Sequence, residues 1–299
     1  MKTKISVLLL SLVLSQDTFS IVAVDPISGQ VGSAGASCIA GSIIISDIHP
    51  GVGVIHTQSY WTSSNQNYAS SLMDMGYSPN EIIQSLIEND SGNNSTIRQY
   101  GVVDLYNNEA RTAAFTGENC FDYKGHILGD TYAIQGNILI GSEILEEMQN
   151  QFVNTNGSLS EKLMASLQGA NVSGADIRCL EDNLSSLSAF IRVAKINDFE
   201  GDYFLDLNVQ DVEFSGYHID PIDSLQVLFD EWYLNNLEYE LGDVNQDENI
   251  DILDVISVIN IILGVHYPSL VENLSSDINE DGIVNIQDVI ILIAIILDS

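Results

Sequence analysis

Two stretches near the end of the chain carry oxygen-bearing side chains at matching positions. One covers residues 243–254 and the other residues 277–288, an offset of 34 residues (243 to 277). Each has such side chains at loop positions 1, 3, 5 and 12, while position 7 offers its carbonyl and position 9 a further side-chain oxygen. Ca²⁺ takes about six to eight oxygen ligands at such spacings. The predicted ligands are Asp243, Asn245, Asp247, Asn249, Asp251 and Asp254 in the first loop, and Asp277, Asn279, Asp281, Ile283, Asn285 and Asp288 in the second.

An apolar stretch follows each loop. These stretches, residues 252–263 and 286–297, have the length of short helices, and the unbroken apolar run 289–297 is too short to span a bilayer. We therefore expect the two helices to pack against each other and to leave an apolar stripe for a partner. The competing interpretation is an acidic loop that water alone solvates. Two copies of one spacing disfavour it, so the sequence predicts two EF-hand-type calcium loops.

A second candidate for chemistry is Thr18, near the start of the chain. A threonine hydroxyl is a weak nucleophile until a base takes its proton. If Thr18 were the first residue of the mature chain, its own α-amino group, with a pKa near 8, would serve as that base. The alternative is that Thr18 is only a β-branched residue that opens a strand.

The element that must position Thr18 is a hairpin. Residues 18–24 and 30–37 alternate apolar and small side chains, and residues 25–29 read Asp-Pro-Ile-Ser-Gly, a turn sequence. The sequence therefore predicts two paired strands with Thr18 at the free end of the first.

Residues 1–15 are typical of a secretion signal. Lys2 and Lys4 precede the apolar run 5–14, which is too short to cross a bilayer. The alternative is an ordinary N-terminal strand. A signal predicts that the protein is extracellular or secreted, with attachment at the cell surface as one possibility.

Cleavage of that signal is expected after Ser15. Gln16 and Asp17 would then precede Thr18, and Asp17 is a poor residue for a signal peptidase to leave at its cut. An uncapped Thr18 therefore requires a second processing step or an unusual cut. Without it, the fold would be kept and the chemistry lost.

Composition limits the partners. The 299 residues hold 42 acidic and 9 basic side chains, a net charge of −33, and no Lys or Arg follows Lys195. Such a surface repels nucleic acid and anionic membranes and suits cations such as Ca²⁺. Most of these acids need do no more than keep the protein soluble. The length permits two domains, and an apolar content of 45% permits a sizeable core.

Helical and strand periodicities alternate between the hairpin and the calcium loops. Strands at both ends of this region, with helix pairs between them, predict a mixed α+β layered domain. Ser78 to Glu81 forms a capping box, and Asn107-Asn108 is typical of a hairpin turn. The expected strands are 51–60, 100–105, 110–115, 129–140, 187–196 and 203–209, and the expected helices are 68–76, 79–86, 144–152, 159–167 and 221–234.

The chain has three cysteines, Cys38, Cys120 and Cys179. In an exported protein one disulfide and one thiol is the default, and three pairings are possible. Because Cys38 and Cys120 each follow a strand pattern, we favour that pair slightly. None of the three lies in a nucleophile-like motif.

Four motifs in order resemble the domain-of-unknown-function family 1028, which belongs to the N-terminal-nucleophile (Ntn) hydrolase superfamily. They are residues 18–23 (TFSIVA), 98–104 (RQYGVVD), 114–117 (AFTG) and 135–139 (QGNIL). The resemblance covers about residues 18–234. It implies a four-layer αββα sandwich, and it implies that Thr18 stands at the nucleophile position. Hydrolysis of an amide bond is then an expectation at the level of the superfamily.

Four further residues are candidates for the site. Asn137, after Gly136, is the candidate oxyanion donor, or else a plain strand-end residue. Asp176 and Arg178, two apart on an extended segment, could orient the amine and bind a carboxylate, or form a surface ion pair. Arg98 could anchor an anionic substrate or pack on its own stem.

His56 lies on an apolar strand, and we interpret it as a core histidine rather than a base. The Asn-x-Ser/Thr sites, such as those at Asn93 and Asn183, carry little weight without a known host.

The paired loop–helix units of residues 241–299 resemble the type I dockerin module. That resemblance implies a cohesin-like or cell-surface protein as partner. The expected organisation is a signal at 1–15, an Ntn-hydrolase-like domain at 18–234, a linker at 235–240 and a small all-α calcium-loop module at 241–299.

Two functions remain open from the sequence. The first is a secreted hydrolase that cleaves an unidentified small-molecule or peptide amide (C–N bond) and docks through calcium. The second is a non-catalytic binding or assembly protein with the same fold.

Overall fold

The computed structural model describes residues 18–210, 219–237 and 239–298. The predicted signal, its cleavage site and Gln16-Asp17 lie outside the described residues. The chain divides into two compact units after Phe229, and each is described by itself. Among the described residues, none of the helices combines the length and the apolar character that a membrane crossing needs.

Two antiparallel sheets form the first unit. One has the strand order β10-β9-β2-β1-β8-β7 and the other the order β3-β4-β5-β6. In the first sheet, the strands are β1 (Phe19–Asp25), β2 (Gln30–Ser37), β7 (Gly125–Leu128), β8 (Tyr132–Gly136), β9 (Ser188–Ala194) and β10 (Leu205–Val209). In the second sheet, they are β3 (Ser46–His49), β4 (Gly53–Gln58), β5 (Gln99–Tyr106) and β6 (Glu109–Thr116).

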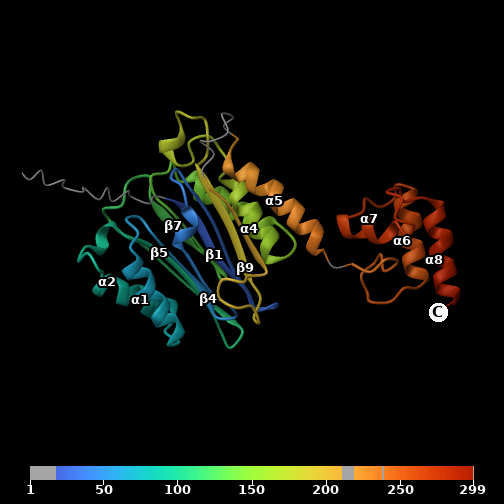
Figure 1. Cartoon of the computed structure of the whole chain (residues 1–299), viewed down its shortest axis with the longest axis horizontal. Coiled ribbons are helices and arrows are strands. Elements are labelled where there is room, and N and C mark those ends of the chain that lie inside the picture. Colours follow the sequence, from blue (N-terminus) through green and yellow to red (C-terminus); the bar gives the residue numbers. More distant parts are fainter. Residues whose placement is uncertain (1–17, 211–218, 238, 299) are drawn as a thin grey trace, which may run out of the picture. The chain divides into compact units, whose positions relative to one another are not determined.

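Helices cover the outer face of each sheet, as Figure 1 shows. α1 (Ser63–Asp74) and α2 (Pro79–Glu88) pack on the four-stranded sheet, and α3 (Glu143–Asn154) and α4 (Leu159–Gly169) pack on the six-stranded sheet. The two sheets face each other. The predicted αββα sandwich is therefore confirmed.

The space between the sheets is apolar along most of its length. Val22 and Val24 of β1 pack there with Val54 of β4 and Val103 of β5. Side chains alternate along a strand, so Ser20 points to the same side as Val22. The first strand thus changes from apolar to polar on this inner face as it approaches Thr18.

Local sequence signals explain several boundaries. In the first hairpin, the Asp25 carboxylate accepts hydrogen bonds from the backbone N–H groups of Ile27 and Ser28, which shapes the turn. Asn107 and Asn108 both have positive φ, as a two-residue hairpin turn between β5 and β6 requires. The capping box at Ser78 also forms, since its N–H donates to Glu81 Oε2 at 2.8 Å.

Several predictions about local structure were wrong. The expected strand 129–140 is regular only over β8, because residue 138 adopts a positive φ of 55° that ends the extended run. Strands β3 and β7 were missed, because four residues are too few for a periodicity. Three short 3₁₀ helices were also missed: η1 (Ser42–Ile45), η2 (Ser95–Ile97) and η3 (Ile177–Cys179).

The favoured cysteine pairing was wrong as well. The disulfide joins Cys38 to Cys179, with Cα atoms 5.7 Å apart, and Cys120 is a buried thiol. Cys120 lies beyond the end of β6, where its Sγ donates to the Arg98 carbonyl oxygen. The pairing depends on two segments that are 141 residues apart, so no local pattern reveals it.

The second unit is helical. It contains α6 (Ile252–Ile262), α7 (Leu270–Ser276) and α8 (Ile286–Asp298). Helix α5 (Pro221–Asn236) begins in the first unit and ends two residues beyond the expected position 234. As expected, α6 and α8 pack together. Their core consists of Val244, Val255, Val258, Val289 and Leu292. Helix α7 was missed although Ser269 and Glu272 form its capping box.

Candidate functional site

Thr18 lies at the polar end of the space between the sheets and is 1% exposed. It stands one position before β1, flanked by the ends of β2 and β8. Its carbonyl oxygen accepts two hydrogen bonds, from Gln58 Nε2 at 3.0 Å and from the Asn137 backbone N–H at 3.2 Å. One donor comes from each sheet, so both sheets fix the position of this carbonyl.

Buried amide side chains surround this carbonyl. Gln99 Oε1 accepts from Gln58 Nε2 and from Asn137 Nδ2, both at 2.8 Å. Gln99 Nε2 in turn donates to Thr116 Oγ1 and to the carbonyl oxygens of two glycines, at 2.8–3.0 Å. Two of these neighbours are carbonyl oxygens, which can only accept, so the atom facing them must be Nε2 of Gln99. The orientations of the Gln58 and Asn137 amides follow from that of Gln99.

Strained backbone surrounds the same point. Ser59 and Tyr60, directly after Gln58, both have φ of 56°, and Ile138, directly after Asn137, has φ of 55°. Non-glycine residues rarely adopt this conformation, and a β-branched residue does so least of all. Such residues cluster at functional sites, because the surrounding structure must hold them there.

Asp176 and Arg178 lie at the neighbouring strand end. Arg178 Nε and Nη2 donate to the two oxygens of Asp176 at 2.9 and 2.6 Å. Arg178 Nη2 also lies 3.4 Å from Ser37 Oγ, and Ser37 ends β2 beside Thr18. The structure thus brings the pair toward Thr18.

Two details of this pair differ from expectation. Asp176 precedes the 3₁₀ turn η3 rather than lying on an extended segment with Arg178. Asp176 is also fully buried, whereas the Arg178 side chain is 29% exposed, so the pair lies partly inside the protein rather than wholly on its surface. Its Oδ2 accepts from the Cys38 N–H at 3.0 Å, and the Cys38–Cys179 disulfide holds the two segments together next to this contact.

Asn137 and Arg98 have defined partners. The Asn137 N–H donates to the Thr18 carbonyl, and one Nδ2 hydrogen is donated to Gln99. In the described part of the chain, its buried Oδ1 has no hydrogen-bond partner. Arg98 is 5% exposed and binds Asp90 and the Tyr60 carbonyl. Burial raises the pKa of Asp90, but hydrogen bonds from Arg98 and its neighbours outweigh this and lower that pKa to about 2.

His56 is fully buried on β4. Its Nδ1 lies 2.9 Å from Ser20 Oγ, and its ring meets the Phe190 ring edge to face at 5.8 Å. Burial, helped by the charge of Arg192, lowers the pKa of His56 to about 3, so the ring is neutral near pH 7.

Three glutamines of this site, Gln58, Gln99 and Gln135, were missed as functional residues. Each is a buried polar residue on an otherwise apolar strand. That mismatch is the signal that could have identified them, because buried amides need partners.

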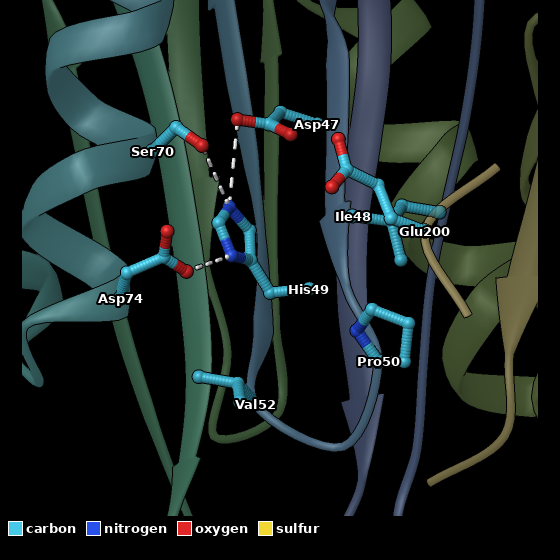
Figure 2. A pocket seen from close by; sticks show the side chains of 8 residues that line it. All are labelled: Asp47, Ile48, His49, Pro50, Val52, Ser70, Asp74 and Glu200. Carbon is cyan, nitrogen blue, oxygen red and sulfur yellow. Dashed lines mark hydrogen bonds and ion pairs between the residues drawn. The ribbon is translucent and has the colours of Figure 1, made fainter. Parts of the chain in front are cut away.

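A hollow of about 240 Å³ lies elsewhere (Figure 2). In it, His49 bonds to Asp74 Oδ1 at 2.8 Å and approaches Ser70 and Asp47. Burial lowers the pKa of His49, but these carboxylates raise it more, so the net shift is upward. The hollow lies at the Gly53 end of β4, whereas Gln58, which contacts Thr18, lies at the other end of that strand. The hollow is therefore separate from Thr18.

The two C-terminal loops share one pattern of hydrogen bonds. In the first loop, Asp243 Oδ1 and Oδ2 accept from the N–H groups four and five residues later, and Asp277 does the same in the second. Asp254 and Asp288, at position 12, are fully buried and accept backbone N–H groups of their own loops. The carboxylates at positions 1 and 12 are thus turned toward their own loops.

The donor set of these loops fits Ca²⁺, a hard cation that prefers oxygen ligands. In the described part of the chain, His, Cys, Asp and Glu side chains do not gather in threes as a metal cluster would require. The loops, however, also use asparagine and carbonyl oxygens, which are not among those residue types. The residues at position 9 also cap the helices that follow the loops. Asp251 Oδ1 accepts a hydrogen bond from the first turn of α6, and Asn285 Oδ1 accepts one from the first turn of α8.

Two family models match the chain. The model described as "Family of unknown function (DUF1028)" matches residues 18–218, and the model described as "Dockerin type I domain" matches residues 241–297. No curated protein matches the sequence.

Among solved structures, the chain is similar to protein SPO2555 from Silicibacter pomeroyi, which matches the same DUF1028 model. The TM-score is 0.58 at 24% identity, over 73% of this chain and 89% of that chain. Two ancestral β-subunits, named Anbu, are weaker matches. The one from Yersinia bercovieri has a TM-score of 0.32 at 12% identity, over 73% and 96% of the two chains. A mutant from Hyphomicrobium sp. strain MC1 has 0.37 at 8%, over 79% and 100%.

Proposed function

Because the chain belongs to the DUF1028 family and ends in a type I dockerin domain, we propose that it is an exported amidohydrolase that docks through its C-terminal module. Thr18 is the nucleophile in this proposal. The observation that carries it is the pair of hydrogen bonds from Gln58 and Asn137, which hold the Thr18 carbonyl from both sheets. A residue that merely opened a strand would need no donor from the opposite sheet.

The proposed reaction has two steps. The Thr18 hydroxyl attacks the carbonyl carbon of the substrate amide while the Thr18 α-amine takes the hydroxyl proton. The same amine gives that proton to the leaving nitrogen, the C–N bond breaks, and the acyl group remains as an ester on Thr18. Water, activated by the amine, then cleaves the ester and releases a carboxylic acid.

Neighbouring groups have supporting roles in this reaction. Asn137 can donate to the developing oxyanion through the second hydrogen of its Nδ2, since Gln99 takes only one. Arg178, beside Ser37, can bind a substrate carboxylate, while Asp176 holds its guanidinium in place. The Arg98 guanidinium is already paired with Asp90. Arg98 can therefore anchor an anionic substrate only if that substrate displaces the Asp90 carboxylate.

The N-terminus decides this proposal. We expect the intact mass of the exported chain to place its first residue at Thr18. The chain should then react once with a peptide epoxyketone, an electrophile that captures the hydroxyl and the amine of one N-terminal residue together. Thr18→Ala should abolish that reaction and any amide hydrolysis, and Thr18→Ser should retain both.

Thr57→Ala is the matched control, because Thr57 is equally buried on β4 but bonds to Gln66 rather than to Thr18. It should react like the wild type. A working exported chain that still begins at Gln16 contradicts the enzyme proposal.

The C-terminal module supplies the docking part. Its exposed apolar residues repeat with the loops: Ile252 and Ile286 are 60% and 61% exposed, and Leu263 and Leu297 are also exposed. We propose that Ca²⁺ in both loops orders this surface and that a cohesin-like or cell-surface protein binds it. Calorimetry should detect two calcium sites, and binding of a cohesin should require Ca²⁺.

One observation favours the second candidate, a non-catalytic assembly protein. Thr18 is 1% exposed in the chain that still carries residues 1–17, so an untrimmed chain offers a substrate no access to this residue. This candidate predicts a capped Thr18 and no epoxyketone adduct, while docking through the C-terminal module remains.

A further inference from the structure

A buried polar chain continues from Thr18 to residues that the proposed reaction does not use. Gln58 donates to the Thr18 carbonyl through Nε2, and its Oε1 accepts from Ser20 Oγ at 2.6 Å. Ser20 Oγ also lies 2.7 Å from Gln135 Nε2 and 2.9 Å from His56 Nδ1. All these side chains are at most 1% exposed.

The direction of each hydrogen bond follows from the donors available. A serine hydroxyl donates once and accepts twice. Ser20 gives its hydrogen to Gln58 Oε1, so it accepts from Gln135 and from His56. His56 must therefore carry its hydrogen on Nδ1, and its Nε2 is buried with no hydrogen-bond partner among the residues that the structure describes.

The neutral form of His56 is essential to this arrangement. A protonated ring would need an acceptor for Nε2–H, and no buried acceptor contacts that atom among the described residues. Burial lowers the pKa of His56 to about 3, which agrees with this reading.

Gly101 makes room for the chain. It pairs with His56 across β4 and β5, and an added Cβ would lie 2.0 Å from Gln135 Oε1. Any side chain at residue 101 would displace the Gln135 amide from Ser20 and His56. The missing side chain of Gly101 on β5 thus leaves the space that the Gln135 amide occupies.

We propose that His56, Ser20 and Gln135 are positioning residues for Thr18, acting through Gln58. The two donors on the Thr18 carbonyl fix the planar peptide group that includes the Thr18 Cα. The amine can then move only by rotation about the single bond from Cα to the carbonyl carbon, and the hydroxyl by that rotation and by rotation about the Cα–Cβ bond. The Gln58 amide is held from both sides, by Gln99 Oε1 at its Nε2 and by the Ser20 hydroxyl at its Oε1. Without the Ser20 contact, only Gln99 would keep this amide aligned with the Thr18 carbonyl.

This inference rests on the proposed function for its catalytic meaning but makes a separate structural claim. The test uses the full chain beginning at Thr18. His56→Asn keeps a donor at the place of Nδ1, and His56→Leu removes it. We expect the rate of epoxyketone labelling to fall by about 10²-fold in His56→Leu, since small misplacements cost that much, and to recover to within about tenfold of the wild type in His56→Asn.

Ser46→Ala is the matched control. Ser46 is the cross-strand neighbour of His56, and its Oγ bonds to Ser33 Oγ at 2.8 Å between the sheets. Its loss removes a buried hydrogen bond without touching the chain to Thr18. Labelling of Ser46→Ala should stay at the wild-type rate. Equal slowing in Ser46→Ala and His56→Leu would mean that His56 contributes only to the stability of the fold and does not position Thr18.

A second readout separates the two proposals. The Gln58 side-chain amide should be protected from hydrogen exchange in the wild type and in His56→Asn but exposed in His56→Leu, and the Thr18 carbonyl ¹³C shift should move with it. If the wild type is never labelled yet these signals behave so, the positioning role stands and the enzyme proposal fails. Unchanged NMR signals and an unchanged labelling rate in His56→Leu overturn the positioning role.

Discussion

The Thr18 network and the calcium loops are both built from polar side chains, but they are assembled in opposite ways. The Thr18 network draws one or two residues from each of several strands, among them Ser20 of β1, Gln58 of β4 and Gln135 of β8. Each calcium loop takes all its side chains from twelve consecutive residues. The first arrangement exists only when two sheets have closed on each other.

This difference predicts different dependences. The network is buried between the two sheets, so its stability follows that of the sandwich. Each loop instead gathers several carboxylate and amide oxygens in a unit with a small core of five buried residues. A cation should therefore matter greatly to the loops and little to the network.

Removal of Ca²⁺ should have the largest effect. Ligand binding that occurs only in the folded state is folding free energy, so EDTA should unfold residues 241–299 and abolish their melting transition. The sandwich should keep its own transition. Circular dichroism of the full chain during chelation measures both. Asp254→Ala and Asp288→Ala should each mimic half of the effect, and tail helices that survive EDTA would contradict the proposal of calcium-dependent folding.

Loss of the Asp176 carboxylate should come next. Asp176→Ala removes the acceptor of the Cys38 and Arg178 backbone N–H groups and the partner of the partly exposed Arg178 guanidinium. It should lower the free energy of unfolding by about 2–3 kcal/mol. Arg192 and Asp206 offer the same two-pronged geometry with a carboxylate side chain that is 33% exposed. There Asp206→Ala should cost less than about 1 kcal/mol. Urea unfolding of both variants measures the difference, and equal losses would show that burial is not what distinguishes the two pairs.

Acid should weaken the sandwich through His56. The folded pKa is about 3 and the unfolded value is 6.5, so between these the unfolded chain binds a proton that the folded chain does not. The contribution of His56 is therefore complete above about pH 6.5 and is lost as the pH falls toward 3. Urea midpoints from pH 7 to 4.5 should fall less steeply in His56→Asn than in the wild type. Parallel curves would mean that His56 is not held neutral.

The smallest expected effect compares the two loops with each other. Position 6 is Glu248 in the first loop and Gly282 in the second, and both have positive φ, at 67° and 83°. A residue with a Cβ is strained there by about 1 kcal/mol. Glu248→Gly should therefore stabilise its loop by up to about that amount, and Gly282→Glu should weaken the other. Calorimetry of each variant measures the calcium affinities of the two loops. The first loop should gain affinity relative to the second in Glu248→Gly, and the second should lose affinity relative to the first in Gly282→Glu.

The sequence was most informative where structure is local. The capping box at Ser78, the Asn107-Asn108 turn and the helices that follow the two repeated loops each depend on residues within about a dozen positions, and in each case the structure has the predicted element. The hairpin at Thr18 also formed as expected, because its alternation and turn are contiguous. Helix α7 was not predicted, although the Ser269 and Glu272 pair that caps it is a local signal of the same kind.

Contacts between distant segments could not be predicted. The burial of Asp176 and its contact with the Cys38 N–H depend on how η3 docks against the end of β2. The roles of Gln58 and Gln135 depend on the spacing of two sheets, which no periodicity encodes. The positive φ at Ile138 contradicts local preference and is imposed by the surrounding structure.

The Cys38–Cys179 bond closes a long covalent loop. The two cysteines are 141 residues apart, and the loop contains the whole four-stranded sheet and four helices. Closing it restricts the unfolded chain, so the bond should add about 2–4 kcal/mol to the stability of the sandwich. Urea unfolding with and without a reducing agent measures that contribution without any substrate.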